Sequence, residues 1–371
     1  MIEGAVPVPM VDDHAHPFPL AAAALGLAGI SLDVGEDEES VARRRELAPG
    51  RLTSEALQVR LSRLLGCPVE DVVSVRDAAA AADWTAYVRR LFDDVGVQTM
   101  LLDGGPAPLG PADLRAAAGV AGRPMSALLR IEAVADPMIA AGAGAVEVCA
   151  EVERRVAAAA ASGVAGLKTV LAYRTGLAVD PDAGLAAAER SLDPAVPVRR
   201  RGKALRDLLL RRVLGQCADL RLPIQVHTGF GDSELTLAQS DPLLLEELLR
   251  SPEATAADVV LIHGGFPWHE QVAHLAATRP RVWAELSLTN LISPATTADR
   301  LLRLIDLAPT HRVLLGSDGH GPPETHWFAL AVLRDAWRSV TDRLAGSVRS
   351  GWLDGVERRI FRDNARGLYR L

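Results

Sequence analysis

Residues 6–16 read VPVPMVDDHAH, an apolar run that ends in two aspartates and two histidines. We interpret the run from Val6 to Asp12 as a short strand. Because side chains two residues apart in a strand point to the same side, His14 and His16 are expected to lie together at its carboxyl end. Two adjacent imidazoles form half of a metal site. An H-x-H pair alone is a weak signal, so the other half has to come from elsewhere in the chain.

Three further segments have the same design, in which an apolar run ends in a metal-binding residue type and glycine follows. They read LPIQVHTG at residues 222–229, VVLIHGG at 259–265 and VLLGSDG at 313–319, with His227, His263 and Asp318 as the candidate ligands. A fourth run, GVAGLK at residues 163–168, ends at Lys168. Near-continuous apolar runs of this length are typical of strands buried on both faces in a parallel sheet.

Eight strand candidates alternate with helical stretches along the chain. This alternation predicts a parallel sheet, since parallel strands need crossover connections. Every candidate ligand also stands at the carboxyl end of a strand. The two observations together predict an α/β fold of the (β/α)8 TIM-barrel type over residues 1–371, with the active site on the carboxyl-terminal face. The remaining strands are predicted at residues 97–102, 125–134, 164–172 and 282–288.

Residues 19–95 separate the first two predicted strands, a longer stretch than one crossover helix needs. The spacing and composition of this segment predict helices over Thr53–Leu65 and Asp77–Phe92. We expect a helical insertion between strands 1 and 2 that covers the barrel mouth, because long insertions commonly shape a binding site. A packing or oligomer-contact subdomain is the alternative.

Composition narrows the class of protein. The apolar fraction of 49% suits a large core, and the net charge of −7 argues against nucleic-acid binding, which favours a basic face. The three cysteines lie far apart, which excludes a disulfide framework and suits a reducing compartment. The first residues lack the layout of a signal peptide, and the alanine-rich runs are too short to span a bilayer. We expect a soluble cytoplasmic protein that acts on a small-molecule substrate, and both a monomer and a homo-oligomer stay open.

The candidate ligands favour a divalent metal ion at the barrel mouth. His14, His16, His227 and Asp318 offer the imidazole and carboxylate donors that suit zinc, manganese or iron. Such an ion lowers the pKa of bound water to about 7, and Asp318 could take the proton. His263 could bind a second ion, or act as a general acid or electrophile near the substrate carbonyl.

Lys168 is the ambiguous member of this set. A protonated amine beside a dication would be repelled, so the side chain is expected to be neutral, carboxylated to a carbamate that bridges two ions, or turned towards an anionic substrate. The alternative is an ammonium paired with a carboxylate such as Glu132.

The pattern His14-x-His16, His227, His263 and Asp318 resembles the amidohydrolase superfamily of metal-dependent barrels. The closing residues 360–369, IFRDNARGLY, are similar to the superfamily's usual final helix. Within it, the chain looks closer to the amidohydrolase 2 branch, and LKTVLAYRTGL (167–177) and HTGFGD (227–232) resemble the barrel half of fungal FluG-type proteins. In those proteins a glutamine-synthetase-like domain follows the barrel, and we expect it to be absent here. The resemblance implies one ion, zinc in the first place with manganese or iron as alternatives, and His263 as catalyst. Two ions are expected if Lys168 is carboxylated.

Four further residues are candidates for substrate binding. Arg174 follows the fourth strand and could clamp a carboxylate in a bidentate pair. Glu132, near Arg130 on the third strand, could contact substrate or form a structural ion pair. Asp232 could bind an amino group or cap a helix, and His320 lies two residues beyond Asp318.

These residues predict a metal-dependent hydrolase that cleaves the C–N, amide-type bond of a small carboxylate-bearing substrate. Asp318 would carry the proton from water to the leaving nitrogen, His263 would stabilise the oxyanion, and a γ-glutamyl-type amide fits the FluG resemblance. The alternative is a metal-dependent decarboxylase on the same scaffold. A non-catalytic ligand sensor is disfavoured, because it would not need both Asp318 and His263.

Overall fold

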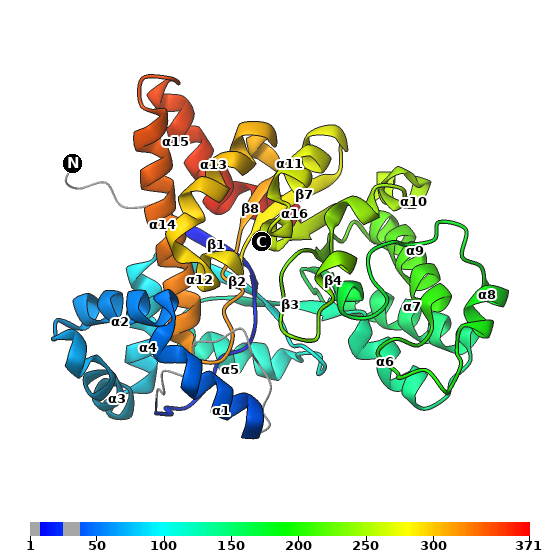
Figure 1. Ribbon diagram of the computed structural model, residues 1–371, viewed down its shortest axis with the longest axis horizontal. Coiled ribbons are helices and arrows are strands. Elements are labelled where there is room, and N and C mark those ends of the chain that lie inside the picture. The colour runs from blue at the N-terminus through cyan, green and yellow to red at the C-terminus, as the bar shows by residue number, and fades with distance from the viewer. Residues whose placement is uncertain (1–7, 25–37) are drawn as a thin grey trace.

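The computed structural model describes residues 8–24 and 38–371. Its centre is a sheet of eight parallel strands in the order β1 to β8, each paired with the next along the chain (Figure 1). The predicted (β/α)8 barrel is therefore confirmed. The strands are β1 Met10–Ala15, β2 Val97–Asp103, β3 Met125–Arg130, β4 Gly166–Thr169, β5 Ile224–His227, β6 Val259–Ile262, β7 Val282–Leu286 and β8 Val313–Leu315.

The two ends of the sheet meet at a seam between β8 and β1. The amide of Asp318 donates to the carbonyl of His14 at 2.8 Å, and the amide of His16 donates to the carbonyl of Gly319 at 2.8 Å. Below them, the carboxylate of Asp12 accepts the amide of Ser317 at 2.8 Å and its hydroxyl at 2.6 Å. A side chain thus takes part in closing the barrel.

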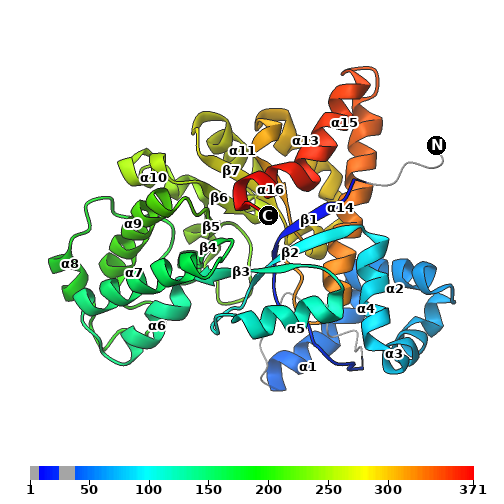
Figure 2. The ribbon, with the colours of Figure 1, turned by 180° about the vertical axis from the view of Figure 1, so that it is seen from behind.

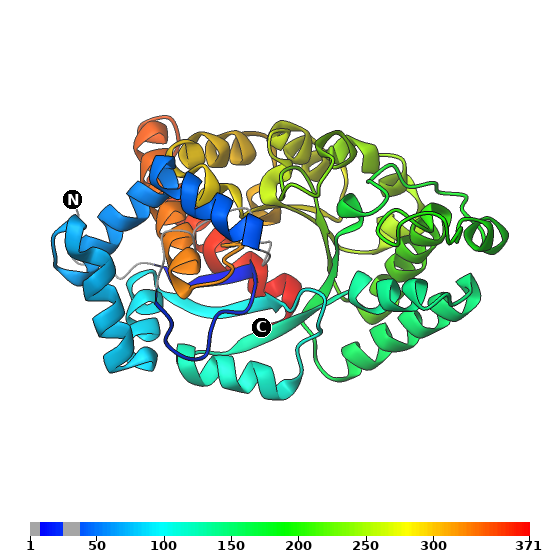
Figure 3. The ribbon, with the colours of Figure 1, turned by 60° about the horizontal axis from the view of Figure 1, so that its bottom comes forward.

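Helices surround the strands, as Figure 3 shows. Because strand side chains alternate between two faces, Val313 and Leu315 of β8 pack into the large core under the helices, whereas Leu314 joins a smaller cluster. Tyr369 on the last helix, α16 Asn364–Tyr369, belongs to that smaller cluster, and α16 contacts β1 and β8 (Figure 2).

The helices after β2 are α5 Pro111–Ala121, α6 Glu132–Ala140, α7 Ala145–Ala161, α8 Leu185–Arg190, α9 Lys203–Leu220, α10 Pro252–Ala256, α11 His269–Thr278, α12 Thr289–Ile292, α13 Thr297–Leu307, α14 Pro323–Leu344, α15 Ser350–Arg358 and α16.

Within the described residues, four α-helices lie between β1 and β2, grouped at one end of the molecule in Figure 1. They are α1 Glu38–Leu47, α2 Leu52–Leu65, α3 Val72–Ala82 and α4 Trp84–Asp94. The single helix predicted over residues 77–92 is wrong: it is broken at Asp83, whose side chain accepts the amide of Ala86 at 2.9 Å and begins α4. Residues 25–37 of the predicted insertion lie outside the described residues, and its covering of the barrel mouth stays a prediction.

This group of helices is tied to α14 by a buried network. Arg76 of α3 donates to Glu324 at 2.5 Å, and Tyr87 of α4 donates to the same oxygen at 2.7 Å. Glu324 lies on the first turn of α14, shortly after Asp318. The network therefore anchors α3 and α4 close to the loop that follows β8.

Several predicted strands have different bounds in the structure: the second ends at Asp103 rather than residue 102, and the seventh ends at Leu286 rather than residue 288. The first, third and fourth differ more. The first was predicted over residues 6–12 but is Met10–Ala15, and Val6 and Pro7 lie outside the described residues. The third was predicted to residue 134, but the chain turns into α6 at Glu132. The fourth was predicted over residues 164–172, but β4 ends at Thr169 and a 3-10 turn follows. The apolar runs continue past the strands because the first turn after each strand is also buried.

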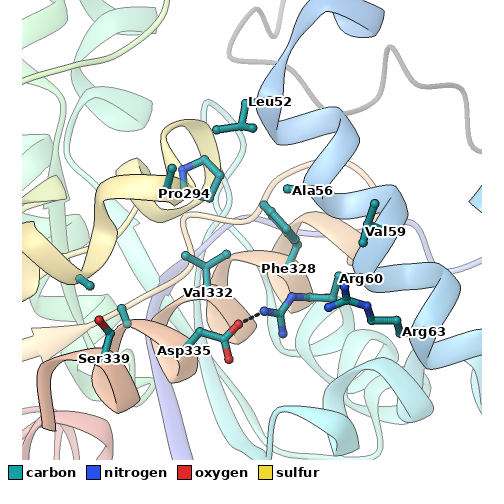
Figure 4. A pocket seen from close by; sticks show the side chains of 13 residues that line it. Leu52, Ala56, Val59, Arg60, Arg63, Pro294, Phe328, Val332, Asp335 and Ser339 are labelled. Atoms are coloured by element: carbon teal, nitrogen blue, oxygen red, sulfur yellow. Dashed lines mark hydrogen bonds and ion pairs between the residues drawn. The ribbon is translucent and has the colours of Figure 1, made fainter. Parts of the chain in front are cut away.

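A groove of about 450 Å³ lies between α2, the start of α13 and α14 (Figure 4). An ion pair between Arg60 and Asp335 crosses it, with Phe328 and Val332 on its wall. None of the candidate ligands lines it. Among the helices of residues 8–24 and 38–371, none is both long and apolar enough to cross a bilayer.

Candidate metal centre

Asp318 lies at the centre of the predicted site, at the carboxyl end of the barrel. Its Oδ1 is 3.1 Å from Nε2 of His14 and 3.4 Å from Nε2 of His16, and its Oδ2 is 4.0 Å from Nδ1 of His263. Burial acts to raise the pKa of the Asp318 carboxyl, but the three imidazoles outweigh it and hold that pKa well below its usual range. The ends of β1, β6 and β8 thus bring four predicted residues together.

The donor atoms form two overlapping sets that could each hold a metal ion. One set is His14, His16 and Asp103, and the other is His14, His263 and Asp318; within each set the donor atoms lie within 4.8 Å of one another. Imidazole nitrogens with one carboxylate are a donor set for zinc and related ions. The residues present therefore fit a divalent ion.

Burial keeps His14, His227 and His263 neutral, as metal binding requires. Burial, together with the charge of Lys168, lowers the pKa of His14 to about 4. Burial also lowers the pKa of His227 and of His263 well below the ordinary value. Neutral rings keep a nitrogen lone pair for a cation at neutral pH.

Two of the central residues have strained backbones. His263 has a φ of +69° and Asp318 a φ of +49°, both in the left-handed region that residues other than glycine seldom adopt. Such a conformation costs about 1–3 kcal/mol and clusters at functional sites, where the surrounding structure enforces it. The bends lie where β6 and β8 end, at the point where these side chains meet.

His227 lies beside the two donor sets without joining either. Its ring centroid is 4.5 Å from that of His263 and 4.8 Å from that of Tyr173. Its Nε2 is 2.9 Å from the carbonyl oxygen of Phe230, to which a ring N–H can donate. A ligand role for His227 therefore has to use Nδ1 or a rotated ring, and it stays a prediction.

Lys168 is buried beneath the histidines. Its Nζ is 3.4 Å from Nε2 of His14, and within the described residues it forms no ion pair with a carboxylate. Burial lowers its pKa to about 8. The ion pair with Glu132 that we considered is not formed, because Glu132 accepts a hydrogen bond from Thr169 at 2.6 Å instead.

Asp103, at the end of β2, orients His16 and pairs with Arg130. Its main-chain oxygen is 2.9 Å from Nδ1 of His16, which directs the opposite nitrogen towards Asp318. Its carboxylate accepts Nε of Arg130 at 3.1 Å and Nη2 at 2.6 Å. Sequence reasoning missed Asp103, although its place between a predicted strand and Gly104 was the same signal that marked Asp318. From the sequence, Glu132 was a candidate partner of Arg130. In the structure, Arg130 pairs with Asp103 instead.

Arg174 lies in a second cluster of charges. Its Nε donates to Oδ2 of Asp136 at 2.8 Å, and Nη1 of Arg206 is 2.7 Å from Oδ1 of the same carboxylate. Two guanidinium groups thus share one carboxylate, so the cluster carries a net positive charge.

Asp232 and His320 are placed by the loops after β5 and β8. The amide of Asp232 donates to the hydroxyl of Tyr173 at 3.1 Å, and its carboxylate accepts the amide of Glu234 at 2.9 Å, as in a turn cap. Nδ1 of His320 is 3.0 Å from the carbonyl oxygen of Asp318. His320 therefore lies next to the metal centre, whereas Asp232 stabilises its loop.

Comparison with known proteins agrees with this geometry. The chain is 28% identical to Protein fluG of Emericella nidulans over 90% of its own length and 42% of that protein, so it spans less than half of this relative. A putative metal-dependent hydrolase from Lactobacillus casei has a TM-score of 0.84 at 23% identity, covering 98% of this chain and 95% of that one. A uronate isomerase from Thermotoga maritima has a TM-score of 0.68 at 13% identity, covering 98% and 94%. At these identities, the two structures support the barrel fold alone.

A family model described as "Amidohydrolase" matches residues 11–371, which include every candidate ligand from His14 to Asp318. The chain therefore belongs to the amidohydrolase family, in the amidohydrolase 2 branch, and its fold is that of a metal-dependent enzyme.

Proposed function

We propose that this protein is a metal-dependent hydrolase that cleaves the C–N bond of a small, carboxylate-bearing amide. The observation that carries the proposal is the position of the Asp318 carboxylate, within 3.4 Å of two imidazole nitrogens and near a third. A buried, ionised carboxylate among imidazole nitrogens offers both a ligand and a proton acceptor. We expect one ion, zinc in the first place, held by His14, His16 and Asp318 with His227.

Each residue of the centre has a role in this reaction. When bound, the divalent ion would polarise the substrate carbonyl and lower the pKa of the attacking water. Asp318 would accept the proton of that water and pass it to the leaving nitrogen, since its lowered pKa keeps the carboxylate ionised and able to accept at neutral pH. His263 faces the same place and exchanges a proton or hydrogen bond with the reacting groups.

The charge cluster at Arg174 favours an anionic substrate. Arg174 and Arg206 share the single charge of Asp136, so a substrate carboxylate would neutralise the surplus positive charge. Arg174 is 14% exposed and thus accessible, whereas Arg206 is buried. The similarity to Protein fluG makes a γ-glutamyl-type amide the first substrate class to try.

A substrate screen tests the reaction type. Purified protein loaded with Zn²⁺ is incubated with γ-glutamyl amides, with N-acyl amino acids and with aromatic or enolic carboxylic acids, and both amine release and carbon dioxide release are measured. Hydrolysis predicts amine release that Asp318→Asn abolishes. Carbon dioxide release without amine would reject hydrolysis in favour of decarboxylation. Ser54→Ala, a buried serine on α2 outside the site, is the matched control.

A further inference from the structure

Two buried side chains of the β7 region connect to His263 and have no role in the reaction so far. Nδ1 of His263 is 2.8 Å from the hydroxyl oxygen of Ser287. That hydroxyl is in turn 2.8 Å from Oε2 of Glu285, and the main-chain amide of His263 is 2.9 Å from the same Oε2. His263, Glu285 and Ser287 are all fully or almost fully buried, at 1%, 0% and 0% exposure.

The directions of these hydrogen bonds follow from the donors available. A main-chain amide can only donate, so Oε2 of Glu285 is an acceptor. A serine hydroxyl has one hydrogen, and Ser287 donates it to Oε2. With the serine hydrogen on the bond to Oε2, the remaining contact of the hydroxyl, with Nδ1 of His263, is accepted by the serine oxygen, and Nδ1 carries the hydrogen. A neutral imidazole has only one N–H, so Nε2 of His263 is left with a lone pair.

The backbone around this chain of contacts keeps it in place. The carboxylate of Glu285 accepts the main-chain amide of His263 as well as the hydroxyl of Ser287. The carboxylate and the backbone of His263 are therefore held together. Leu288, directly after Ser287, has a left-handed φ of +52°, as His263 itself does at +69°. Two strained positions in neighbouring loops thus hold the hydroxyl and the ring at hydrogen-bond distance.

We propose that Glu285 and Ser287 are positioning residues that fix His263 in its Nδ1–H tautomer, which leaves Nε2 as the acceptor of the ring. This inference rests on the proposed function for its importance. A metal ligand and a general base both need that lone pair, whereas a donor to a substrate oxyanion would need a hydrogen on Nε2. The tautomer therefore favours a ligand or base over the electrophilic role that the sequence suggested.

The test is a tautomer measurement on the full chain. Protein labelled with ¹⁵N-histidine is studied by long-range ¹H–¹⁵N correlation, as purified and after addition of Zn²⁺, and the signals of His263 are assigned by their loss in His263→Asn. The proposal expects a protonated Nδ1 and an unprotonated Nε2 in both samples. A protonated Nε2 in the purified protein would overturn it.

Variants at Ser287 test how the tautomer is set. Ser287→Ala removes the acceptor of the Nδ1 hydrogen and should shift His263 towards the Nε2–H form, whereas Ser287→Thr keeps a hydroxyl and should retain the wild-type pattern. Ser54→Ala is the matched control for loss of a buried hydroxyl. An unchanged tautomer in folded Ser287→Ala would exclude Ser287 from this role; should that variant not fold, the wild-type spectrum and Ser287→Thr still decide. Because the readout needs no substrate, it is independent of whether the proposed hydrolysis is found.

Discussion

The carboxylate of Asp12 on β1 accepts both the amide and the hydroxyl of Ser317, at 2.8 and 2.6 Å, and so joins the first strand to the loop after the last. The pair lies one residue before Asp318 and two before His14, so the closure of the barrel and the geometry of the metal centre depend on the same seam. Burial raises the pKa of Asp12 to about 7, against the hydrogen bonds from Ser317 that lower it. A buried carboxyl group of this kind depends on its donors.

Ser317→Ala should therefore destabilise the fold. The substitution leaves an oxygen of Asp12 without its hydroxyl donor in a fully buried place, which costs about 1–3 kcal/mol. Urea denaturation followed by circular dichroism measures the free energy of unfolding. Ser54→Ala should change that free energy by less, since the hydroxyl of Ser54 has no hydrogen-bond partner in the described part of the chain; equal effects of the two variants would remove the seam's special role.

Thiol reactivity should separate the cysteines by burial. Burial raises the pKa of the Cys217 thiol to about 12, and Cys149 is also buried with a raised pKa, whereas Cys67 is partly exposed. Since the thiolate is the reactive form, the partly exposed Cys67 should be labelled in the native protein, whereas Cys217 should stay nearly unlabelled even at pH 9. The pKa of Cys217 is higher in the folded protein than in the unfolded chain. Ionisation of this thiol at high pH therefore lowers the stability of the folded protein. Mass spectrometry after labelling with a thiol reagent reports each site, and fast native labelling of Cys217 would contradict its buried place.

Removal of the lysine side chain should distinguish one metal ion from two. In the one-ion reading, Lys168→Ala keeps the full metal content, because Nζ lies 3.4 Å from a histidine nitrogen but is not itself a ligand. A carbamate that bridges two ions would instead be lost with the lysine, and one ion with it. Metal content per chain, with Arg154→Ala on the surface as a control, measures the difference.

Arg174→Ala should weaken the binding of acidic substrates. The loss of a charge-assisted hydrogen bond of about 1.5–3 kcal/mol predicts a KM higher by roughly 10- to 100-fold, with a smaller change in kcat. The uncharged amide of the same substrate should bind the two proteins alike. An unchanged KM for the acidic substrate would place Arg174 outside the substrate site and leave it a structural partner of Asp136.

Much of the centre could be predicted from the sequence, because a parallel barrel brings the carboxyl ends of its strands together whatever their spacing in the chain. His14, His16, His263 and Asp318 each end an apolar run, and each lies where that rule puts it. Asp103 ends a strand in the same way and could have been found by the same reasoning.

The partners of these residues could not be predicted, because they depend on short turns and on neighbouring strands. Arg130 at the end of β3 pairs with Asp103 at the end of the neighbouring strand β2. Glu132 is not available for this pair, because it lies in the first turn of α6. Ser287 reaches His263 only because β6 and β7 are adjacent and bend at their ends. The ring orientation of His227 is set by a carbonyl three residues away, which no residue pattern reveals.

Metal analysis of the wild type, His14→Ala and Ser54→Ala by plasma mass spectrometry tests the central claim most directly. Protein purified without chelators should contain one divalent ion per chain, and His14→Ala should lose most of it, because His14 belongs to both donor sets; Ser54→Ala should retain it. A His14→Ala protein that keeps the full metal content and the wild-type activity would contradict the assignment of the metal centre.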